Sequence, residues 1–134
     1  MRTTIAGLCL AALAAAGCME NATEPSDVLG TTWHLESLQR ANGSEVTPPA
    51  GTFTIRFADD GRLEVRADCN VCGGGYTLDG DSVGVGVLAC TRAFCASAPF
   101  DTDYVTLVES AVRIEREGDT LALRGPAGIL RFVP

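Results

Sequence analysis

The chain has 134 residues, a length that fits one domain, and a formal net charge of −7 at neutral pH. Every basic side chain except one histidine is an arginine, and the sequence shows no basic stripe. This charge argues against nucleic acid as a partner and against electrostatic docking on anionic lipid. A domain of this size can build one modest core, and it is small enough for disulfides to matter.

The first 17 residues predict a signal peptide. Arg2 gives a positive start, and residues 5–16 form an apolar run that is too short to span a bilayer as a mature helix. The run ends in small residues before Cys18, which resembles a bacterial lipobox, where the cysteine is acylated and becomes the new N-terminus. Its lipid chains would give a stable membrane anchor. The alternative is an ordinary signal cleaved after Ala16, which would give a freely soluble product.

Residues 18–27 predict a lipidated cysteine followed by a flexible polar tether, because residues 20–27 contain a proline and no large apolar side chain. Met19 stands where an aspartate would favour retention in the inner membrane. The resemblance to this sorting rule implies anchoring at the periplasmic face of the outer membrane, if the host has one. The folded domain is expected over residues 28–134.

Short alternating segments with turn signals between them dominate the domain. The segment Thr52–Phe57 places Phe53, Ile55 and Phe57 on one face, and Asp59-Asp60-Gly61 then predicts a hairpin turn. A cysteine- and glycine-rich stretch, residues 69–75, is expected to be a loop. Strands are predicted at about residues 33–38, 52–57, 63–66, 76–78, 83–87, 112–114, 121–123 and 130–132.

One segment changes period. From Asp101 to Ala111, apolar residues recur at helical spacing, with Tyr104, Leu107 and Val108 on the same stripe. Asp101 is expected to cap the N-terminus of this helix. The predicted fold is therefore a curled or barrel-like antiparallel sheet of about eight short strands with one helix late in the chain.

Four cysteines fall in the domain, in two short segments: Cys69, Cys72, Cys90 and Cys95. An exported protein enters an oxidising compartment, so two disulfides are expected, and the sequence allows three pairings. Two alternatives stay open. The spacing also outlines a four-cysteine zinc site, and Cys-x-x-Cys is the outline of a redox pair.

Several motifs together carry a family resemblance. Gly30-Thr31-Thr32-Trp33-His34-Leu35, the Asp68-Cys69-Asn70 segment with Tyr76 behind it, and Thr91 to Cys95 appear in an order that resembles the META domain family of HslJ-like envelope proteins. The resemblance covers about residues 28–133. Asp68 departs from the pattern, since the family has glycine there.

The resemblance implies a compact, mostly β domain in the bacterial envelope. It also implies a pairing: Cys69 and Cys95 are the family-type cysteines, which leaves the added Cys72 and Cys90 to bond to each other. Members have been associated with heat-shock induction and novobiocin resistance. No catalytic mechanism is established for the family, so the resemblance implies a location and a shape but no reaction.

The residues themselves also argue against an enzyme. His34 is the only histidine and is expected to face outward, no nucleophile motif appears, and the paired aspartates lie in glycine turns. No cofactor, metal or catalytic residue is predicted. Gly73–Gly75 offers backbone amides that could cradle an anion, but these glycines are expected to adopt positive φ beside a disulfide.

Four residues that flank the cysteine segments are candidate binding residues: Asn70, Tyr76, Arg92 and Phe94. The predicted function is that a monomeric envelope lipoprotein, related to envelope stress or antibiotic tolerance, binds another envelope protein or a glycan here. The competing interpretation is that Tyr76 and Phe94 are core and Asn70 holds a turn. Two other functions stay open: a metal-binding or thiol-redox protein using the four cysteines, and a small-ligand carrier.

Overall fold

The computed structural model describes residues 27–96 and 100–134. The predicted signal peptide, Cys18 and tether lie outside these residues. The first described residues pack against the core: Val28 is fully buried, and its carbonyl oxygen accepts a hydrogen bond from Trp33 Nε1 at 3.1 Å. Leu29 then forms a bridge with Phe57. The described chain is therefore tied into the core from its second residue.

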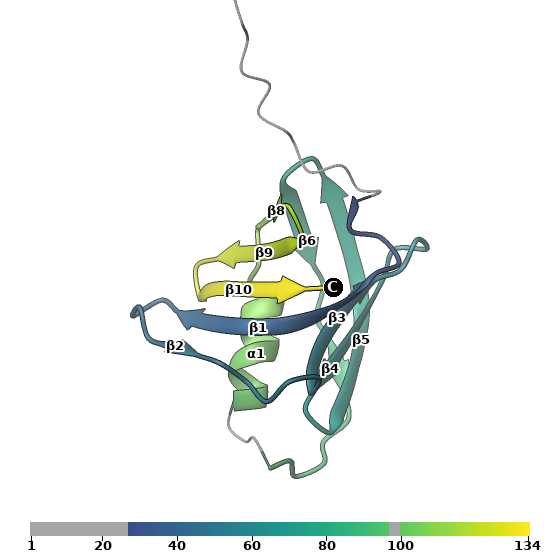
Figure 1. Ribbon diagram of the computed structural model, residues 1–134. Helices are drawn as coiled ribbons and strands as arrows, with labels where there is room; N and C mark the ends of the chain where they lie inside the picture. Colours follow the sequence, from purple (N-terminus) through teal and green to yellow (C-terminus); the bar gives the residue numbers. More distant parts are fainter. Residues whose placement is uncertain (1–26, 97–99) are drawn as a thin grey trace, which may run out of the picture.

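Ten strands and one helix make up the described domain, and Figure 1 shows their arrangement. The elements are β1 (Thr32–Arg40), β2 (Glu45–Val46), β3 (Phe53–Phe57), β4 (Arg62–Ala67), β5 (Asn70–Asp79), β6 (Ser82–Val85), β7 (Ala89–Cys90), α1 (Phe100–Glu109), β8 (Arg113–Glu117), β9 (Thr120–Gly125) and β10 (Gly128–Val133).

Eight of the strands close into an antiparallel barrel. The order is β10-β9-β8-β6-β5-β4-β3-β1, and β1 pairs with β10 to complete the circle. β2 extends the sheet beside β1, and β7 pairs with β5. Closure pairs the strand edges that an open sheet would expose. The predicted fold, a barrel-like antiparallel sheet with one late helix, is confirmed.

One expected loop is part of a strand: β5 runs through the stretch 69–75. The short strand β2, between β1 and β3, lies outside the predicted strands. The glycines at 73–75 do not have positive φ; they are extended and pair with β4. The physical reason for glycine is crowding, since a Cβ on Gly74 would lie 2.9 Å from Leu88 Cδ2 and 3.0 Å from the Val87 carbonyl oxygen.

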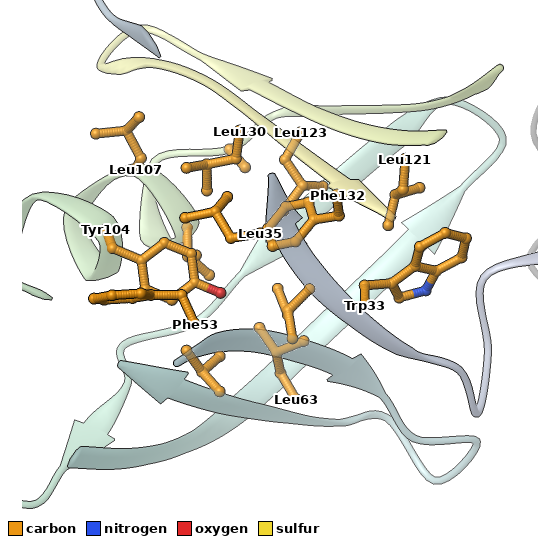
Figure 2. Packing of buried hydrophobic residues seen from close by; sticks show 14 of the residues in the cluster. Trp33, Leu35, Phe53, Leu63, Tyr104, Leu107, Leu121, Leu123, Leu130 and Phe132 are labelled. Carbon is orange, nitrogen blue, oxygen red and sulfur yellow. The ribbon is translucent and has the colours of Figure 1, made fainter. Parts of the chain in front are cut away.

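The barrel interior is filled by side chains, as Figure 2 shows. Phe53 is central: its ring meets Phe100 and Tyr104 edge to face at centroid distances of 4.8 and 5.2 Å. Fully burying side chains of this size contributes about 1.5–3 kcal/mol each. The largest fully buried side chains are Trp33, Tyr104, Phe53, Phe57, Phe132, Leu38, Ile55, Leu63, Ile114, Leu121, Leu123 and Leu130.

The helix packs against strands from separate parts of the barrel. β6 and β8 pair only at Ser82 and Arg113, and α1 contacts β4, β6, β9 and β10. Its buried stripe is the predicted one, Tyr104, Leu107 and Val108. Asp101 lies in the first turn rather than before it. Across the residues that the structure describes, no helix is long and apolar enough to cross a membrane.

Candidate functional site

Two disulfides gather the cysteines at one end of the barrel. They join Cys69 to Cys95 and Cys72 to Cys90, the pairing that the family resemblance implied. Cys72 and Cys90 are direct cross-strand neighbours in the β5–β7 pair. Because both bonds connect the start of β5 to the chain around β7, they fix the segment Thr91–Cys95, which we call the stapled loop.

Asn70 holds the stapled loop from inside. It is 6% exposed, and its Oδ1 accepts hydrogen bonds from Thr91 Oγ1 at 3.0 Å and from the Ala93 amide at 2.8 Å. Its Nδ2 donates to the Ala93 carbonyl at 3.0 Å and to Cys95 Sγ at 3.2 Å. Asn70 therefore holds a turn, as the competing interpretation states, and its side chain forms hydrogen bonds within the stapled loop.

The backbone before Cys69 explains one departure from the family pattern. Asp68 has φ of 60°, in the left-handed region, where the family's glycine fits without strain. Aspartate tolerates this region better than most side chains. Its own amide donates to the Thr52 carbonyl at 2.9 Å, which fixes the turn between β4 and β5. The substitution thus preserves the backbone course that brings Cys69 to Cys95.

Arg92 and Phe94 point outward from this rigid base. Both are exposed, and Phe94 is as exposed as a free side chain, at 106%. The competing interpretation that Phe94 is core is therefore wrong. Beside the loop, between β7 and α1, lies a hollow of about 680 Å³. Its α1 wall includes Val105 and Glu109, and Glu109 Oε1 accepts a hydrogen bond from the Leu88 amide at 2.8 Å.

Tyr76 lies elsewhere. It is half-buried, its ring meets Phe57 edge to face at 5.0 Å, and its hydroxyl donates to the Ala58 carbonyl. Burial raises the pKa of Tyr76, and the nearby Asp60 and Asp59 carboxylates raise it further. The structure thus brings together Asn70, Arg92 and Phe94 from the predicted set, whereas Tyr76 lies farther along β5 and packs against the end of β3.

Nothing in the described ranges, 27–96 and 100–134, assembles three side chains that could hold a metal ion. The four cysteines are used in disulfides. His34 is half-buried on β1, opposite Val133 and Thr54. Asp60 accepts a hydrogen bond from the Arg62 amide at 3.0 Å, which is turn chemistry.

Sequence analysis missed a second charged feature. Arg62, Glu64 and Arg66 all face outward on β4, with Arg56 beside them on β3. The alternation of β4 was a sufficient signal, because alternate residues of a strand share one face. A hollow of about 450 Å³ lies over these residues and the neighbouring Gly73.

Comparison with known proteins places this geometry in a family. The META domain matches residues 26–134. A solution structure of a protein from Burkholderia xenovorans is similar, with a TM-score of 0.67, 17% identity, and coverage of 93% of this chain and 97% of that chain. A DUF4847 family protein from Bacteroides vulgatus has a TM-score of 0.62 and 14% identity, with coverage of 81% of this chain and 94% of that chain.

Another solution structure has a TM-score of 0.63 and 22% identity, with coverage of 83% of this chain and 94% of that chain. At these identities the likeness shows the fold alone. No curated protein matches the chain. The family match covers the whole described domain, with its barrel, late helix and stapled loop. The chain belongs to the META domain family.

Proposed function

We propose that this protein is an exported, lipid-anchored envelope protein that acts without catalysis, by binding another envelope protein or a glycan through the stapled loop. The observation that carries the proposal is the fixed presentation of Arg92 and Phe94. An exposed phenylalanine loses favourable burial unless a partner covers it, and aromatic and arginine side chains are the types enriched at interfaces.

Preorganisation supports the same proposal. Binding costs less free energy when the binding segment is already ordered. The stapled loop is ordered by the Cys69–Cys95 and Cys72–Cys90 bonds and by the hydrogen bonds of Asn70. A loop of this kind can offer its exposed side chains to a partner without a large conformational change.

The position of the loop fits a tethered protein. In Figure 1, the start of the described chain, in purple, lies toward the top of the molecule, and the green chain that precedes α1 lies at the bottom. A lipid on Cys18 would hold the Asp27 end nearest to the membrane. The stapled loop would then face away from the membrane, toward other envelope components.

The two other functions have less support. A zinc site needs free thiols, and a Cys-x-x-Cys redox pair bonds its own two cysteines, whereas the structure joins Cys69 to Cys95 and Cys72 to Cys90. A ligand carrier of the barrel type needs an empty interior, whereas the described core is packed by the side chains of Figure 2. A ligand would therefore have to bind in a surface hollow.

Site-specific photo-crosslinking in intact cells tests the proposal. A photoreactive phenylalanine analogue at Phe94 is expected to give one defined adduct, and Arg92→Ala in the same chain is expected to weaken it. The matched control places the analogue at Val112, which is 56% exposed and lies outside the hollow beside the stapled loop. Equal adducts at the two positions, or none at Phe94, would refute binding through the loop.

A further inference from the structure

The outer face of β3, β4 and β5 carries a second candidate site, separate from the stapled loop. Along β4, Arg62, Glu64 and Arg66 alternate outward with buried residues. Arg62 and Arg66 are four residues apart, so their Cα atoms lie about 13 Å from each other at the usual strand rise. The midpoint between them is Glu64, whose cross-strand partner on β5 is Gly73.

Small residues leave a space at this midpoint. In the row across the strands, Glu64 faces Gly73, and Gly73 faces Ala89 on β7. Gly73 and Ala89 have no long side chain, whereas the longer side chains of Arg62, Arg66 and the exposed Val71 surround them. The result is the hollow of about 450 Å³, which we call the arginine hollow.

Both arginine side chains are long enough to reach the midpoint, and Arg62 already lies over it. A Cβ built on Gly73 would be 3.3 Å from Arg62 Nη2. Arg66 lines the other side of the hollow, at the end of β4, where its Nε donates to the Asp68 carbonyl at 3.0 Å. The arginine hollow therefore has a guanidinium group on two sides before any ligand arrives.

The charges of the hollow do not cancel. Arg56 Nη1 lies 3.0 Å from Glu64 Oε2, so the one carboxylate at the midpoint has its own partner. In the described part of the chain, neither Arg62 nor Arg66 forms a salt bridge. Two guanidinium groups thus remain for a ligand, in a chain whose net charge is −7.

We propose that the arginine hollow binds a dianionic phosphoryl group carried by a small soluble molecule. A phosphate monoester carries nearly two negative charges and three acceptor oxygens, which match two guanidinium groups better than a single carboxylate does. An anionic membrane surface fits less well. Its field would repel the acidic molecule as a whole, whereas a small anion interacts mainly with charges within about 8 Å.

The test is an NMR titration of the exported full chain carrying Cys18→Ser, with inorganic phosphate at constant ionic strength. The expected result is a saturable shift of the Gly73 amide and the Arg62 and Arg66 Nε–H signals. Arg62→Gln or Arg66→Gln is expected to weaken binding at least about tenfold, because each removes a charge-assisted hydrogen bond. Arg113→Gln, the control for charge on the distant β8, is expected to leave binding unchanged.

Gly73→Val gives an independent test, since it fills the hollow and keeps both arginines. Its Cβ is crowded only by the flexible end of Arg62, at 3.3 Å, because the Leu63 carbonyl oxygen lies at an ordinary contact distance of 3.8 Å. The strand is therefore expected to persist, and phosphate binding is expected to be lost. No saturable shift at millimolar phosphate would overturn the proposal. So would equal weakening by Arg113→Gln, or binding to phosphatidylglycerol vesicles without binding to phosphate.

Discussion

Replacement of Asn70 by alanine is the sharpest test of how the stapled loop is held. The change removes a side chain that is 6% exposed and connects β5 to residues 91–95. It leaves both disulfides in place. The loss of stability therefore measures what the amide contributes beyond the covalent bonds.

The magnitude follows from three hydrogen bonds to nitrogen or oxygen: those with Thr91 Oγ1, the Ala93 amide and the Ala93 carbonyl. Each contributes about 0.5–1.5 kcal/mol net. Because Thr91 and Ala93 are exposed, water can replace part of what is lost, and we expect a decrease of about 2 kcal/mol in the free energy of unfolding. For a domain of this size the Tm would fall by roughly 8 °C.

Urea unfolding of the oxidised protein, followed by tryptophan fluorescence from the single Trp33, measures this decrease. Asn42→Ala is the matched control, because Asn42 is exposed and accepts one local bond, from the Ser44 amide at 2.9 Å. We expect the control to cost less than about 1 kcal/mol. If the two variants lose the same stability, the disulfides alone hold the loop and the role assigned to Asn70 is wrong.

Two further predictions concern the barrel. Gly125→Ala is expected to destabilise the fold by about 3 kcal/mol or more in thermal unfolding, because its Cβ would lie 2.3 Å from the Ser110 carbonyl oxygen. The control is Gly75→Ala, whose Cβ meets no atom closer than 3.9 Å and which is expected to be neutral or slightly stabilising. Burial raises the pKa of Tyr104 above its ordinary value of 10.0, so the stability that this group contributes is fully present below pH 10 and is lost as the pH rises further. Above pH 10, the free energy of unfolding of wild type is expected to fall by up to about 1.4 kcal/mol per pH unit through this group. Tyr104→Phe is expected to reduce that fall. At neutral pH the same variant is expected to be about 1 kcal/mol less stable, because it lacks the hydrogen bond to the Thr54 carbonyl. Equal pH dependence in the two proteins would contradict the assignment.

Local patterns of apolar residues were sufficient to predict most of the fold. The alternation of Phe53, Ile55 and Phe57 predicted β3, and the helical spacing of Tyr104 and Leu107 predicted α1. Both patterns reflect which face of an element meets the core, so they appear within a few residues of sequence. The family resemblance added the disulfide pairing, which spacing alone left open.

Contacts between distant residues explain what sequence analysis missed. Gly73 and its neighbours have low strand propensity, and their extended form comes from pairing with β4 and β7, which no local pattern shows. Asn70 bonds to Ala93, 23 residues away. For Tyr76, the competing interpretation that it is core was the better one, because counting by two from the buried Asn70 along β5 turns Tyr76 inward.

Mass spectrometry of the protein isolated from the membranes of an expressing bacterial host, with free thiols trapped at lysis, tests the account most directly. It reads the acylation of Cys18 and the state of the four domain cysteines in the same sample. The account predicts an acylated Cys18 at the N-terminus, no trapped thiol, and peptides linked as Cys69–Cys95 and Cys72–Cys90. An unmodified Cys18 would contradict the membrane anchor, and trapped thiols, bound zinc or exchanged pairs would contradict the stapled loop.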